Sequence, residues 1–71
     1  MYAFDRNIRN ADHTRRYTIR PTDDGWEVRA EEDSQTLRRA LYQDWHRVEQ
    51  ARRMFVLELT NLREEGWQEI T

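Results

Sequence analysis

The chain has 71 residues, no cysteine and a formal net charge of −2, and all twelve of its basic residues are arginine. A chain this short buries about 60% of the surface that its unfolded form exposes, which allows one small domain and excludes a deep substrate cavity. The lack of cysteine excludes disulfides and thiolate zinc sites, so stability must come from apolar packing or from self-association. We expect a cytoplasmic, bacterial protein, because no apolar run reaches the roughly 18 residues of a membrane span, no signal peptide is recognisable and exclusive use of arginine indicates a GC-rich genome.

The first segment, residues 1–14, has no sustained hydrophobic period. Terminal segments of small domains are poorly ordered unless something holds them down. The sequence therefore predicts a partly ordered N-terminal arm over 1–14, with Tyr2 and Phe4 able to dock on the body, and a single domain over 15–71.

The next segment has the alternation of a β-hairpin, with strands at about 15–21 and 25–31. Between them, "PTDDG" predicts a tight turn, because Gly25 tolerates a positive φ. The polar positions carry both signs of charge, so we expect cross-strand ion pairs. The apolar positions that share one face are Tyr17, Ile19, Trp26 and Val28.

The segment "EEDSQTLRRALY" fits two structures. As a strand at about 36–42, it completes a meander and turns Leu37 and Leu41 toward the core. As a helix, it lengthens the helix that follows to about thirty residues, well above the mean of about 11–12. A two-stranded hairpin alone is marginal in water, so the third strand is favoured.

From residue 44 to about 65 the sequence has the period of an amphipathic α-helix. At 100° per residue, one group of apolar side chains falls within about 40° of a single line. Asp44 is expected to cap its first turn and Gly66 to end it in a left-handed conformation, before a short strand at 67–70. The apolar group consists of Val48, Ala51, Phe55, Leu59 and Leu62.

Together these elements predict a small α+β fold, in which an antiparallel β-meander of about three strands packs against one amphipathic helix. Each strand and the helix contribute an apolar face that the others cover. The expected core is Tyr17, Ile19, Trp26, Val28, Leu37, Leu41, Trp45, Val48, Phe55, Leu59, Leu62 and Trp67.

Residues 43–53, "QDWHRVEQARR", resemble a chemical site because Asp44, His46 and Glu49 lie close together. A metal would need further ligands, and the other histidine, His13, lies in the unpatterned arm. His46 falls on the solvent side of the helix, where it has neither a pocket nor an oriented partner for acid–base work. The stretch is interpreted as the start of the helix, and we predict no catalytic residue, no metal site and no cofactor.

Charge is laid out along the chain in blocks of alternating sign. Such alternation suits internal ion pairs, or pairing with a second copy, better than a nucleic-acid surface, which needs one sign on one face. The alternative hypothesis is a nucleic-acid-binding module, in which arginines of the sheet meet phosphates and an aromatic ring stacks on a base. Its candidate residues are Arg15, Arg16, Arg20, Arg38, Arg39 and Tyr42.

The outer side of the helix is the other candidate surface. Leu57 falls about 160° from the core line, with Arg53, Asn61 and Gln50 nearby. In a chain that buries little surface, an outward leucine or an uncovered edge strand is a docking place for a second copy. We therefore expect a non-enzymatic accessory domain that acts through protein–protein association, as a homodimer or with another protein, without a membrane or a small-molecule substrate.

In the order of its strands and helix, which ends in "LREEGW", the chain resembles the WGR domain over about residues 16–70. The resemblance implies a sheet-and-helix module of the kind found in nucleic-acid-associated proteins. The Trp-Gly-Arg tripeptide of that family is absent, with "WEVRAEED" in the corresponding region, so the resemblance assigns no functional residue.

Overall fold

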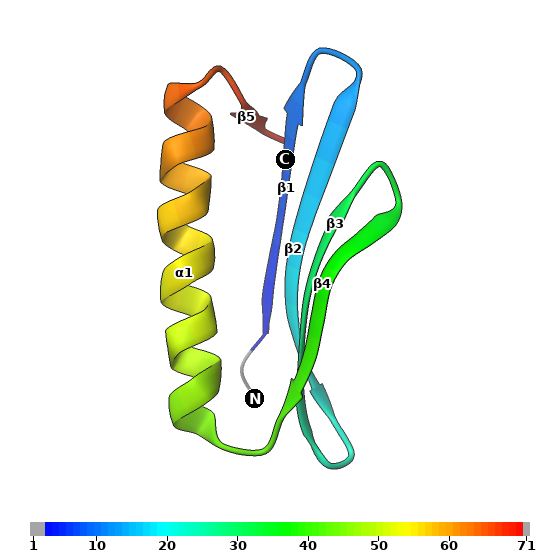
Figure 1. The fold of residues 1–71 in the computed structure, drawn as a ribbon, viewed down its shortest axis with the longest axis vertical. Coiled ribbons are helices and arrows are strands. Elements are labelled where there is room, and N and C mark those ends of the chain that lie inside the picture. Colours follow the sequence, from blue (N-terminus) through cyan, green and yellow to red (C-terminus); the bar gives the residue numbers. More distant parts are fainter. Residues whose placement is uncertain (1–2, 71) are drawn as a thin grey trace.

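The computed structural model describes residues 3–70, which form one antiparallel sheet of five strands and one helix (Figure 1). The sheet order is β4-β3-β2-β1-β5, so the first four strands form a meander and β5 returns to the far edge. The predicted α+β class is confirmed, but the sheet has more strands than the three that were expected. The elements are β1 (Phe4–Asn10), β2 (His13–Thr22), β3 (Gly25–Glu32), β4 (Gln35–Tyr42), α1 (Trp45–Glu64) and β5 (Gln68–Glu69).

The prediction of a partly ordered arm is wrong over residues 4–14, because β1 pairs with β2 along its whole length. Phe4 packs against the core and Ile8 is fully buried. Arg6 lies between them on the same face, so the alternation of apolar side chains is interrupted in the sequence. Its guanidinium bonds to Glu69 of β5, a contact between distant parts of the chain that no local pattern shows. Tyr2 lies outside the described residues.

The hairpin and the third strand lie where they were predicted, and the ambiguous segment 34–43 is mostly strand. The core assignment of Leu37 and Leu41 is wrong, since these side chains are 49% and 61% exposed. A register shift between Ala30 and Glu31 adjusts the pairing, after which Ala40 pairs with Val28 on the helix side of the sheet. Leu41 therefore lies on the open face, and Leu37, at the bulge, lines a groove beside α1 on an edge strand that the helix covers only in part.

The helix has the predicted phase and limits. The Asp44 carboxylate accepts a hydrogen bond from the His46 N–H at 2.9 Å, which confirms the N-cap. At the other end, Gly66 has φ +106 and allows the chain to turn back toward β5. Trp45 was assigned to the core but is 40% exposed, although its ring lies 5.2 Å from that of Trp26.

The molecule has two layers, because α1 covers one face of the sheet and leaves the other open (Figure 1). In the core between the layers, Phe55 of α1 packs on Tyr17 of β2, with ring centroids 4.8 Å apart in an edge-to-face arrangement. Within the described residues, no helix has the length and apolar character required to cross a membrane. The buried apolar core consists of Ile8, Tyr17, Ile19, Val28, Ala30, Val48, Phe55 and Leu59.

Candidate protein-association surface

The sheet divides the predicted arginine patch between its two faces. Side chains alternate along a strand, so Arg15 and Arg38 lie on the helix side with Tyr17 and Ala30. Arg16, Arg20 and Arg39 lie on the open side, whereas Tyr42 lies on the helix side with Ala40. The six residues therefore do not form one contiguous nucleic-acid surface.

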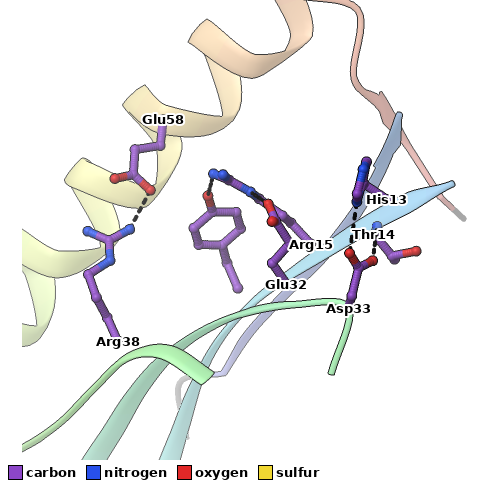
Figure 2. Close-up of polar contacts among 8 residues, drawn as sticks. His13, Thr14, Arg15, Glu32, Asp33, Arg38 and Glu58 are labelled. Carbon is purple, nitrogen blue, oxygen red and sulfur yellow. Dashed lines mark hydrogen bonds and ion pairs between the residues drawn. The ribbon is translucent and has the colours of Figure 1, made fainter. Parts of the chain in front are cut away.

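The two arginines on the helix side are bound within the fold (Figure 2). Arg38 donates to Glu58 at 2.6 Å, which ties β4 to α1, and its guanidinium lies 5.8 Å from the Phe55 ring. Arg15 donates to Glu32 at 2.6 Å and to the Tyr17 hydroxyl at 3.3 Å. The bond to Glu32 raises the pKa of Arg15 further, and burial raises the pKa of Tyr17. These contacts give both arginines a structural role.

On the open side of the sheet, arginines alternate with carboxylates. Arg16 binds Asp5 through two nitrogens at 3.0 and 2.8 Å, and this hydrogen-bonded pair lowers the pKa of Asp5. Arg39 donates to Glu27 at 2.6 Å. These pairs confirm the expected cross-strand ion pairs, and they leave this face with mixed sign.

Strand β4 forms one outer edge of the sheet, and no other strand of the described chain pairs with its outward side. A Cβ added to Gly25 would lie 2.2 Å from the Tyr42 carbonyl oxygen, which shows that this carbonyl points inward, toward β3. Backbone groups alternate in direction along an antiparallel strand. The N–H and C=O groups of Leu41 and Arg39 therefore point outward and are free to pair.

A groove with a volume of about 770 Å³ runs between β4 and α1. Its apolar lining includes Leu37, Ala40 and Met54, and Met54 is 57% exposed. Arg38, Arg39 and Arg47 make its lining basic. In the part of the chain that the structure describes, Arg47 has no carboxylate within ion-pair distance, in contrast to the two arginines of β4.

The predicted partner-binding residues lie on the solvent side of α1, beside this groove. Leu57 is 63% exposed, and Arg53, Asn61 and Gln50 are exposed as well. Gln50 also lines the groove, so the outer helix surface continues into it. We define the edge strip as the exposed apolar side chains around the free edge of β4: Leu37 and Met54, which line the groove, Leu41 on the open face of the sheet and Leu57 on the solvent side of α1.

Only part of this strip was predictable from the sequence. Leu57 was singled out because its helical angle placed it in solvent. The two leucines of β4 were assigned to the core. Their alternation with Arg38 and Ala40 was the available signal, but apolar character alone assigned the wrong face.

A separate polar cluster holds the two hairpin turns at one end of the sheet (Figure 2). Asp33 binds His13 Nδ1 at 2.8 Å and accepts from the Thr14 N–H at 2.9 Å. The bond to Asp33 raises the pKa of His13, and the same bond lowers the pKa of Asp33. His13, Asp33 and Glu32 bring possible metal-ligand atoms within 4.8 Å of one another, but the turn contacts account for the arrangement.

The remaining candidate from the sequence, His46, lies exposed in the first turn of α1, at the opposite end of the molecule from the β1–β2 turn (Figure 1). The two histidines therefore do not come together in one site. Asp44 is engaged in the cap, and Glu49 binds Arg52 at 3.0 Å. The pair with Arg52 lowers the pKa of Glu49, as expected for a carboxylate that stabilises a helix surface.

Known proteins provide no guide to this surface. No family model matches the chain, and no curated protein and no solved structure matches it. The resemblance to the WGR domain in element order therefore assigns no function.

Proposed function

We propose that the chain is a non-enzymatic accessory domain that acts through protein–protein association, first of all with a second copy of itself. The observation that carries the proposal is the edge strip beside the free edge of β4. Natural proteins protect such edges with charged side chains, proline, bulges or very short strands. β4 has eight residues and no proline, its bulge lies near the start of the strand, and the charges of Arg38 and Arg39 are already paired with Glu58 and Glu27.

The energetics of a small domain support this reading. Burying a leucine or methionine side chain contributes about 1.5–3 kcal/mol, and about half of that remains available where the side chain is half-exposed. Four such side chains from each of two copies contribute several kcal/mol, comparable to the roughly 4–15 kcal/mol that association costs. Hydrogen bonds between two free strand edges then favour the complex.

The alternative proposal is nucleic-acid binding through the open-face arginines Arg16, Arg20 and Arg39. Among the described residues, Arg20 has no carboxylate within ion-pair distance, which leaves one charge of this group available. Binding of arginines to phosphates weakens steeply as salt rises, whereas an apolar interface does not. Salt dependence therefore separates the two proposals.

The test is solution mass by light scattering over a range of protein concentrations, at low and at high salt. We expect a salt-resistant dimer for the wild type and a monomer for the double variant Met54→Glu/Leu57→Glu. The matched control is Val56→Glu, since Val56 is 42% exposed on the opposite flank of α1. Circular dichroism checks that all three proteins are folded.

Two results would refute the proposal. A wild-type protein that stays monomeric at every concentration removes self-association. A Val56→Glu variant that dissociates as readily as the double variant shows that the edge strip is not the interface. Binding of a short fluorescent oligonucleotide that disappears at high salt, together with a monomeric mass, favours the alternative.

A further inference from the structure

We infer that the second copy docks by pairing its β4 antiparallel with β4, about a two-fold axis that passes through Ala40. The result is one continuous sheet with five strands from each copy. The inference rests on the proposed self-association and adds the edge, the orientation and the register. A symmetric dimer requires the same surface on both copies, and antiparallel pairing of one strand with itself meets that requirement.

The direction of the backbone groups sets the type of each pair. The N–H and C=O groups of Arg39 and Leu41 point outward. Arg39 of one copy therefore exchanges hydrogen bonds with the partner's Leu41, and Leu41 exchanges them with the partner's Arg39. Ala40 then lies opposite the partner's Ala40 in a pair without hydrogen bonds. In such a pair the Cα atoms lie about 4.5 Å apart, which small side chains allow without a clash.

Like charges exclude the neighbouring registers. Residues directly opposite one another share a face, so an axis through Arg39 or Arg38 would place two copies of that arginine side by side, which is destabilising. An axis through Leu41 leaves only residues 40–42 of β4 to pair, because the strand ends at Tyr42. The axis through Ala40 pairs residues 38–42 and places Arg38 opposite the partner's Tyr42.

Charge complementarity between the helices supports the same register. Tyr42 and Arg47 line the same groove, and Glu58 lies above Arg38, to which it is bound at 2.6 Å. When Arg38 faces the partner's Tyr42, Glu58 faces the partner's Arg47. Arg47, which has no carboxylate within ion-pair distance among residues 3–70, thus meets a carboxylate of the other copy, twice in each dimer.

The spacing of the helices fits this contact. α1 contacts β2, β3 and β4, and its Phe55 also packs on Phe4 of β1, so the helix lies over the middle of the meander, between β2 and β3. The two helices of the dimer are then about four strand spacings apart, roughly 19 Å. This exceeds the 8–10 Å of direct helix packing, so long side chains such as Met54, Arg47 and Glu58 bridge the gap.

Disulfide cross-linking of single-cysteine variants tests the register directly, because the chain has no cysteine of its own. The variants are Arg39→Cys, Ala40→Cys and Leu41→Cys, each mildly oxidised at a concentration where light scattering shows a dimer. A disulfide needs Cα atoms within about 4.4–6.8 Å. Only the residue on the axis meets this limit. At positions 39 and 41, the two equivalent residues of the dimer are diagonal neighbours, with Cα atoms about 7–8 Å apart.

We expect Ala40→Cys to form a covalent dimer at least tenfold faster than the other two variants, with an unchanged melting curve under reducing conditions. Faster cross-linking at position 39 or 41 overturns the register. A dimer that cross-links through Leu57→Cys and through none of the strand positions overturns pairing at β4 but leaves the proposed function standing. A monomeric wild type removes both.

Discussion

The turn glycines provide the sharpest test of the fold, because they differ in what a methyl group would meet. At Gly25, which has φ +151, an added Cβ would lie 2.2 Å from the Tyr42 carbonyl oxygen and 3.1 Å from the Gln43 Cα. Both are backbone atoms, so the end of β4 must move away. At Gly66, with φ +106, the nearest atom is the Asn10 side-chain nitrogen at 4.0 Å.

The magnitudes follow from these contacts. A left-handed conformation costs alanine about 1–2 kcal/mol at either position. Displacing β4 at Gly25 also breaks the two hydrogen bonds of the Trp26–Tyr42 pair, at about 1 kcal/mol each. Replacing glycine by alanine also lowers the conformational entropy of the unfolded chain, which restores about 0.4–1 kcal/mol of stability. We therefore expect Gly25→Ala to lower the free energy of unfolding by about 3 kcal/mol and Gly66→Ala by about 1 kcal/mol.

The assay is urea unfolding followed by tryptophan fluorescence at one protein concentration. A domain of this size has about 3–5 kcal/mol in total, so Gly25→Ala should be largely unfolded at low urea while Gly66→Ala keeps a full transition. Equal losses for the two variants would refute the close approach of β4 to Gly25, and with it the backbone directions assigned to the edge.

Two further predictions concern the core and the turn cluster. Phe55→Ala should cost roughly 3–5 kcal/mol and unfold the monomer, because Phe55 is 3% exposed and packs edge to face on Tyr17; an unchanged melting curve would contradict the helix phase. The pKa of His13 is raised by its bond to Asp33, so the stability from this pair is present below the ordinary histidine pKa of 6.5 and is lost as pH rises through the folded value. In an NMR titration, Asp33→Asn should lower the pKa of His13; an unshifted titration curve would show that the bond is not formed in solution.

The sequence was sufficient for the elements whose signals are local. The Asp44 cap, the helix period and Gly66 define α1, and they do so within a few residues of chain. The hairpin followed from alternation and from Gly25. These signals depend on propensities and short-range hydrogen bonds, which neighbouring residues determine.

The errors occurred where long-range pairing decides the outcome. β1 was not predicted as a strand, because Arg6 interrupts the apolar alternation between Phe4 and Ile8. The partner of Arg6, Glu69, is distant in sequence. The face of β4 was assigned from the apolar character of its leucines, whereas the turn and the bulge set its register. A leucine on an edge strand is tolerated in solvent, so apolar character alone does not predict which way it points.

The same difference between local signals and long-range pairing explains how much of the candidate surface was predictable. The angle of Leu57 follows from the helix period, so its exposure was predictable. The neighbourhood of Leu57, including Met54 and the groove, depends on which strand lies beside α1. Only the fold shows that this strand is the uncovered one.

The two edges of the sheet also decide how far an assembly grows. At the β1 edge, β5 pairs with Ile8 and Arg9, and the Ile70 N–H donates to the Asn7 carbonyl. A sheet with two open edges adds copies without limit and forms filaments. Because β5 covers one edge, only the β4 edge is open to a second copy. The solution mass should therefore reach a plateau at two chains, however concentrated the protein is.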